Sequence, residues 1–104
     1  MAGNKFYTMR GYELLKKDRE PLTPSMEDYL EMIYRYIIEE GSIRINTLAA
    51  LLHVQAPSAS KTVKKLYELG IVEYEGYGLV TLTKEGMDIG QFLLQRHRTI
   101  YEFL

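Results

Sequence analysis

The apolar positions along the chain recur with a helical period over residues 23–40. Their side chains return every three or four residues, as they would on one face of a helix: Leu30, Ile33, Tyr34, Ile37 and Ile38. Thr23 and Pro24 are typical of the cap and the first position of a helix, and Gly41 is typical of its end. The pattern therefore predicts a helix from about Thr23 to about Glu40.

Two further helical segments joined by a tight turn follow within residues 43–70. Ile43-Arg44-Ile45 alternates as a very short strand, and Asn46 is expected to cap a helix with an inner face of Leu48, Leu51 and Leu52. After a turn at residues 53–54, a helix over residues 57–69 carries its apolar side chains on one face: Ala59, Val63 and Leu66. Two helices within about twenty-five residues are typical of a helix-turn-helix.

The last part of the chain predicts a β-hairpin and then a long helix. The strands are expected at residues 71–75 and 79–82, with Gly76-Tyr77-Gly78 as the turn. Thr83 is expected to cap a helix that runs to residue 104 with the apolar positions Met87, Phe92, Leu93, Leu94 and Ile100. The predicted fold is mainly α with a small β-hairpin, a winged helix-turn-helix in which the hairpin is the wing.

We expect this fold to occupy residues 23–104 as one DNA-binding domain, whose last helix begins a linking and dimerisation element. Residues 1–22 form an N-terminal extension in which Tyr12, Leu14 and Leu15 predict a short amphipathic helix. The 104 residues suffice for one core. With no cysteine, disulfides are excluded, and no apolar run approaches the length of a membrane span, so a soluble, cytoplasmic protein is expected.

The distribution of charge is more informative than the net charge of −1. No Asp or Glu occurs from Gly41 to Tyr67, a stretch that contains four basic residues: Arg44, Lys61, Lys64 and Lys65. Acidic residues outnumber basic ones in the preceding helix. Such a two-sided molecule suits a nucleic-acid partner on its basic side, although an ordinary solvated surface has the same appearance.

The predicted second helix of the helix-turn-helix carries the candidate DNA-binding residues. On a helical wheel Ser58, Lys61, Thr62 and Lys65 share the face opposite the apolar one. Small hydroxyl side chains let a helix approach a major groove, Lys61 is expected to reach a base edge, and Lys64 and Lys65 are expected to neutralise phosphates. The full set of candidates on this helix and the wing is Gln55, Pro57, Ser58, Ser60, Lys61, Lys64, Lys65 and Tyr77. For Tyr74 we favour packing over DNA contact, and the wing turn has no Arg or Lys to attract phosphate.

Several separate motifs of the sequence fall in register with a known family. They are Thr23-Pro24-Ser25-Met26-Glu27-Asp28-Tyr29-Leu30-Glu31-Met32-Ile33-Tyr34, Ala56-Pro57-Ser58-Ala59-Ser60-Lys61-Thr62-Val63, Leu82-Thr83-Lys84-Glu85-Gly86 and Arg96-His97. Together they resemble the manganese- and iron-dependent repressors, the family of the diphtheria toxin repressor and the manganese transport regulator. The resemblance covers about residues 23–104.

The resemblance implies a homodimer that binds double-stranded operator DNA when loaded with Mn(II) or Fe(II) and represses metal-uptake genes. It implies that Asp28, Glu31 and His97 are metal ligands, and Asp28 matches the manganese-type branch. Oxygen and imidazole ligands suit both metals. The residues alone also allow an interpretation without a metal, because acids in a first helical turn usually stabilise the helix through its dipole and a lone histidine is usually solvated. Relatives continue into a dimerisation segment with further ligands, so we expect an N-terminal DNA-binding fragment with an incomplete metal site.

Two functions other than a metal-dependent repressor are compatible with parts of this sequence. A metal-independent winged-helix module could use the same helix to bind a protein, and loss of binding with rising salt would distinguish DNA from that partner. A metal-dependent hydrolase could use the three implied ligands, but no nucleophile–base pair or Gly-rich phosphate loop accompanies them. We therefore expect no enzymatic activity.

Overall fold

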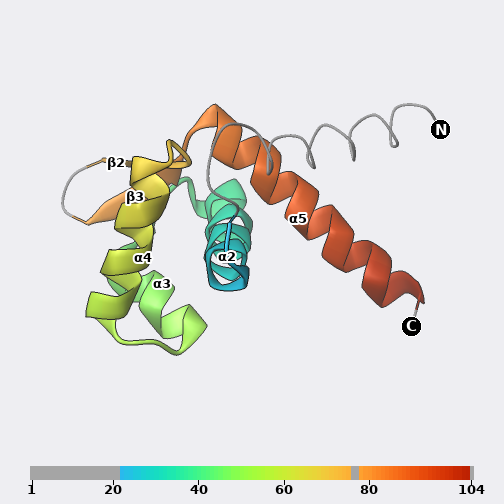
Figure 1. Cartoon of the computed structure of the whole chain (residues 1–104), viewed down its shortest axis with the longest axis horizontal. Helices are drawn as coiled ribbons and strands as arrows, with labels where there is room; N and C mark the ends of the chain where they lie inside the picture. Colours follow the sequence, from blue (N-terminus) through green and yellow to red (C-terminus); the bar gives the residue numbers. More distant parts are fainter. Residues whose placement is uncertain (1–21, 76–77, 104) are drawn as a thin grey trace.

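The computed structural model describes residues 22–75 and 78–103, and for residues 97–103 it describes the backbone alone. Seven elements follow one another in these ranges (Figure 1): α2 (Pro24–Glu40), β1 (Ile43–Arg44), α3 (Ile45–Leu52), α4 (Ala56–Glu68), β2 (Val72–Tyr74), β3 (Leu79–Leu82) and α5 (Lys84–Phe103). This is the predicted fold, mainly α with a small antiparallel sheet. Apart from Leu22, the predicted N-terminal extension lies outside the described residues.

The boundaries of α2 are those that the sequence predicts. Thr23 caps its start, because the Thr23 Oγ1 accepts a hydrogen bond from the backbone N–H of Met26 at 3.1 Å. Gly41 ends it with φ +89°, and its N–H donates to the carbonyl of Ile37 at 2.8 Å. One predicted core position is wrong: Ile38 is 52% exposed.

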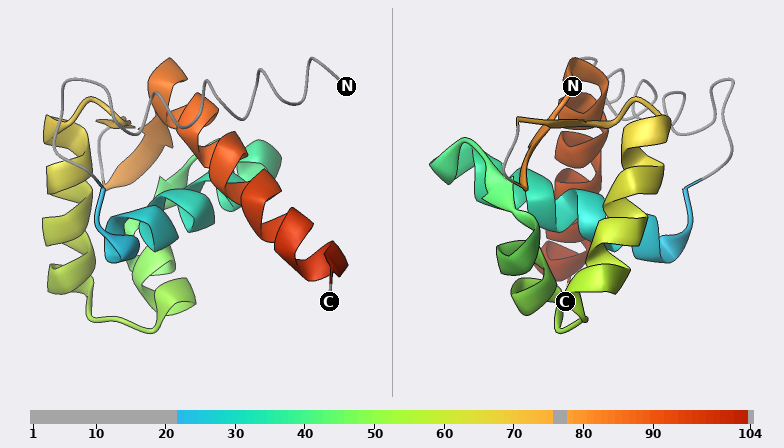
Figure 2. Two further views of the ribbon diagram at one scale, coloured as in Figure 1. Left: turned by 45° about the vertical axis from the view of Figure 1, so that its right-hand side comes forward. Right: turned by 90° about the vertical axis from the view of Figure 1, so that its left-hand side faces the viewer.

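α2 lies in the middle of the molecule, with α3 and α4 on one side and α5 on the other (Figures 1 and 2). Leu30 and Ile33 on α2 are completely buried. The core around them takes one or more apolar side chains from every other helix and from each strand: Ile43, Leu48, Ala59, Val63, Leu66, Val72, Val80, Ile89 and Leu93. Among the described residues, no helix is both long and apolar enough to cross a membrane.

α3, a tight turn and α4 form the predicted helix-turn-helix. The turn uses a left-handed residue, His53 with φ +58°, whose N–H bonds to the carbonyl of Ala50 at 3.2 Å. Two details of the prediction for α3 are wrong. Asn46 lies inside the helix, because α3 begins directly after Arg44, which occupies the cap position without a side-chain hydrogen bond. Leu51 is 40% exposed, since the buried face of this short helix passes through Leu48 and Ala49 instead.

The three strands form one antiparallel sheet in the order β1-β3-β2. The predicted hairpin is present, with Val72 opposite Leu82 and Tyr74 opposite Val80. The short predicted strand at residue 43 becomes its third member, because Ile43 pairs with Val80. We refer to β2, β3 and the connection between them as the wing.

Thr83 joins the start of α5 to the wing and to the end of the helix-turn-helix. Its Oγ1 accepts a hydrogen bond from Gly86 N–H at 3.0 Å, the predicted helix cap. The same hydroxyl donates its proton toward two carbonyl oxygens, that of Gly70 at 2.7 Å and that of Ile71 at 3.0 Å. One hydroxyl group thus serves both a helix start and the connection after α4.

We expect Thr83→Ala to lower the free energy of unfolding by about 1–2 kcal/mol, the usual effect of removing a helix cap. Chemical denaturation followed by circular dichroism measures this loss. Thr83→Ser is the matched control, because it keeps the hydroxyl and should retain most of the stability. Equal losses in the two variants would mean that the methyl group, not the hydroxyl, stabilises this junction.

Candidate nucleic-acid interface and metal ligands

The exposed face of α4 carries most of the predicted DNA-binding side chains. Ala59, Val63 and Leu66 are completely buried, so the opposite side of the helix faces away from the core. On the exposed positions of this helix lie Pro57, Ser58, Ser60, Lys61, Lys64 and Lys65. Thr62 differs from the prediction, because it is half-buried at the edge of the core.

The first turn of α4 is suited to an anion. Gln55 occupies the cap position with no hydrogen bond from its own side chain, and Pro57 stands at the start of the helix. No acidic residue lies in this turn. The backbone N–H groups of a first helical turn and the helix dipole both favour a negatively charged group such as a phosphate.

Ser60, Lys64 and Tyr67 follow one another at intervals of four and three residues, so they form one line along α4. At the end of this line the Tyr67 ring meets the ring of Tyr74 on β2, with centroids 5.2 Å apart and planes at 53°. Burial and the nearby Tyr67 both raise the pKa of the Tyr74 hydroxyl above its ordinary value. The predicted packing role of Tyr74 is therefore supported, with a partner that the sequence reasoning missed.

The wing carries fewer of the predicted DNA-binding residues than α4 does. Tyr77, its predicted DNA-binding residue, lies outside the described residues. Gly78, which follows it, has φ +74°, a conformation that favours glycine at a hairpin turn. Exposed carboxylates begin only at the wing end of α4, with Glu68, and continue on β2 and after it with Glu73 and Glu75. On α4 itself the three lysines therefore lie within the first three turns, before Glu68.

The two predicted metal ligands of α2 differ in their surroundings. The Asp28 side chain belongs to an exposed residue, whereas the side chain of Glu31 is only 9% exposed. Arg35, one turn further along α2, places its Nη1 3.8 Å from the Glu31 Oε2. Asp28 and Glu31 lie three positions apart, so both can reach one cation beside the same stretch of helix.

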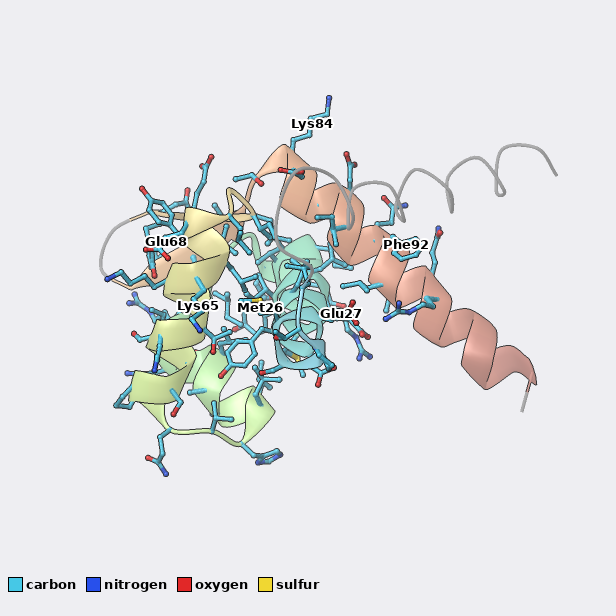
Figure 3. The ribbon with its side chains drawn as sticks, in the orientation of Figure 1. Met26, Glu27, Lys65, Glu68, Lys84 and Phe92 are labelled. Atoms are coloured by element: carbon cyan, nitrogen blue, oxygen red, sulfur yellow. The ribbon has the colours of Figure 1, made fainter. Side chains whose placement is uncertain are left out.

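α5 runs back along α2 toward the N-terminal end of α2. Gly90 lies against Tyr34, and a Cβ at position 90 would be 2.8 Å from that of Tyr34. Two turns further along α5, the Arg96 Nη2 donates to the Glu27 Oε1 at 3.1 Å, and its guanidinium lies 5.9 Å from the ring of Phe92. Figure 3 shows Glu27 on the side of α2 that faces α5.

The ion pair of Glu27 and Arg96 joins the direct chain neighbours of two predicted ligands, Asp28 and His97. The sequence reasoning missed it, because the spacing of residues along the chain does not show that α5 packs beside Glu27. The side chain of His97 lies outside the described part, although its backbone belongs to α5. Within the residues that the structure describes, no group of three or more His, Cys, Asp or Glu could hold a metal ion.

Comparison with known proteins agrees with this geometry. Residues 21–80 match the family model described as iron dependent repressor, N-terminal DNA binding domain. The HTH-type transcriptional regulator MntR of Lysinibacillus sphaericus is 43% identical over 82 residues, 79% of this chain and 59% of that protein. An uncharacterized HTH-type regulator of Methanocaldococcus jannaschii is 40% identical over 84 residues, 80% of this chain and 67% of that protein. The chain thus spans about three fifths of the MntR relative's length.

Solved structures support the fold alone, because their sequences are more distant. The transcriptional regulator Tm0710 of Thermotoga maritima has a TM-score of 0.61 and 23% identity over 95% of this chain and 69% of its own. The DNA complex of MepR from Staphylococcus aureus has a TM-score of 0.62 and 15% identity over 100% of this chain and 79% of its own.

The matched proteins are transcriptional regulators and not enzymes, as the sequence led us to expect. The family model covers more than half of the 104 residues, and the relatives extend the match to about four fifths of them. This chain belongs to the iron dependent repressor family, whose N-terminal DNA binding domain it contains.

Proposed function

We propose that this chain is the DNA-binding part of a metal-dependent transcriptional repressor of metal-uptake genes, which binds double-stranded operator DNA as a homodimer. The observation that carries the proposal is the exposed face of α4, which combines small side chains with lysines and lacks acids in its first three turns. A major groove requires this combination, since small residues permit close approach and lysines offset phosphate charge. The MepR neighbour of similar fold is itself bound to DNA.

The proposal assigns a role to each lysine of the α4 surface. Lys61, in the N-terminal half of α4 and opposite the buried face, reaches a base edge. Lys64 and Lys65 contact phosphates on either side of it. The remaining contacts come from the start of α4 and the wing: Gln55, Pro57, Ser58, Ser60 and Tyr77.

Asp28, Glu31 and His97 are the residues that would hold Mn(II) or Fe(II). The shielded Glu31 carboxylate and the ion pair between Glu27 and Arg96 support this assignment, because the pair brings α5 to the stretch of α2 that carries both acids. Carboxylate oxygens and one imidazole are ligands that both metals accept. A bound cation would link α2 to α5 and leave coordination positions for further ligands.

A titration of duplex DNA with the protein, followed by fluorescence anisotropy, tests the proposed function. We expect a palindromic, A·T-rich duplex to bind more weakly as salt rises, with a logarithmic slope of about −0.9 for each phosphate contact. In the complete protein, Mn(II) should strengthen this binding. Binding of DNA that ignores salt, or no binding at all, would contradict the proposal and favour a protein-interaction module.

Lys61→Ala should weaken binding to the preferred duplex by about 1–3 kcal/mol and should also reduce discrimination against base substitutions. Lys84→Ala is the matched control, because it removes the same charge at the exposed start of α5, where the side chain extends away from α4 (Figure 3). Competition titrations with substituted duplexes measure both effects. If Lys61→Ala lowers affinity equally for every duplex, Lys61 contacts phosphate and not a base.

His97→Ala in the complete protein should abolish the increase in DNA affinity that Mn(II) produces, and it should weaken Mn(II) binding measured by electron paramagnetic resonance. His53→Asn is the control, since it removes the other imidazole and asparagine tolerates the left-handed conformation of that position. An unchanged Mn(II) affinity in the His97 variant would remove this residue from the metal site.

A further inference from the structure

The aromatic pair of Tyr67 and Tyr74 has no role in the function proposed above. The two rings are in contact, yet Tyr67 remains 51% exposed and Tyr74 41% exposed. They therefore bury too little surface to be a major part of the core. The pair nevertheless connects the two elements that approach DNA, because Tyr67 belongs to α4 and Tyr74 to the wing.

Tyr74 lies at the end of β2 that is farther along the chain from α4, so its contact with Tyr67 joins this end of the strand to the helix. β2 leaves α4 through a short connection at Gly70, which has φ +77° and donates its N–H to the carbonyl of Tyr67 at 3.0 Å. Tyr74 lies at the other end of β2, opposite Val80, and is followed by the bond from Glu75 N–H to the carbonyl of Leu79 at 2.9 Å. The aromatic contact thus fastens the far end of β2 to α4, whereas the near end of β2, at Val72, is joined to α4 through the connection that contains Gly70.

Direct contact between the pair and a phosphate is disfavoured by the neighbouring charges. Glu68 follows Tyr67 on α4, and Glu73 and Glu75 flank Tyr74, and all three are exposed. The charge of these carboxylates disfavours a phosphate near the pair, with Glu68 on α4 beside Tyr67 and with Glu73 and Glu75 on the other face of the strand from Tyr74. The nearest lysine on the same line of α4 is Lys64, one turn before Tyr67. The surroundings therefore favour a role in which the tyrosines hold other groups in place.

We propose that Tyr67 and Tyr74 form a brace that fixes the angle between α4 and the wing, so that both meet one DNA duplex at the same time. This inference rests on the proposed DNA-binding function. In the free protein the brace holds the wing in its binding position, and less conformational freedom is lost when DNA binds. The two tyrosines are positioning residues. They do not contact DNA themselves, but they fix the position of the wing relative to α4, which carries Lys64.

Two duplexes test the brace, both derived from the tightest-binding palindrome of the anisotropy titration. One is long enough to reach the wing, and the other lacks the flanking base pairs. Tyr74→Ala should lose roughly two- to tenfold in affinity for the long duplex, the range expected from an aromatic pair, and much less for the short one. Tyr74→Phe keeps the ring contact and should bind both duplexes like the unchanged protein.

A distance measurement tests the same idea without DNA. The sequence contains no cysteine, so Glu68→Cys and Glu75→Cys together allow two spin labels to be attached, one on α4 and one at the end of β2. Double electron–electron resonance should give a narrow distance distribution both in the labelled protein that keeps Tyr74 and in its Tyr74→Phe variant. Tyr74→Ala should broaden it, while the thermal unfolding midpoint shows whether the domain is still folded.

The results separate the brace from the function on which it rests. If the unchanged protein fails to bind either duplex in a salt-dependent way, the proposed DNA-binding function fails and the brace loses its purpose. If the unchanged protein binds but Tyr74→Ala loses the same affinity for both duplexes, or loses none, the brace is wrong. A distance distribution that stays narrow in Tyr74→Ala would also overturn it.

Discussion

The burial of Leu30 and Ile33 on α2 is the interaction on which the other elements depend. Both side chains are completely buried, and α2 contacts α3 and α4 on one side and α5 on the other. Each fully buried side chain of this size contributes about 1.5–3 kcal/mol through the hydrophobic effect. α2 lies between α4 and α5 (Figure 1), so it sets their relative positions together with the hydrogen bonds from Thr83 to Gly70 and Ile71.

The central place of α2 sets the lysines of α4 apart from the carboxylates that are proposed as metal ligands. Figure 3 shows Lys65 of α4 on one side of α2, and Glu27 of α2 and Phe92 of α5 on the other side. Because α5 touches α2 so closely that a side chain at Gly90 would collide with Tyr34, the approach of α5 is set within narrow limits. A cation held between these two helices would act on the same helix against which α4 packs.

Much of the fold could be predicted because its signals are local. The caps at Thr23 and Thr83 and the end at Gly41 depend on a few neighbouring residues, and all three are confirmed. Errors arise where tertiary packing decides: Ile38 is exposed despite its helical spacing. The short strand at Ile43 is confirmed, but its pairing with Val80 does not follow from the local sequence. The outward placement of Lys61 follows from the buried positions of α4, whereas Thr62 shows that a helical wheel does not resolve the edge of a face.

The side chains that the sequence reasoning missed interact across elements. Tyr67 meets Tyr74 because the chain reverses at Gly70, and Glu27 meets Arg96 because α5 runs back along α2. Neither distance can be derived from spacing, since each depends on how two elements pack. Both contacts join partly exposed side chains, so each adds little to stability by itself. Their value lies in orientation: one contact sets the wing against α4, and the other sets α5 against the carboxylates of α2.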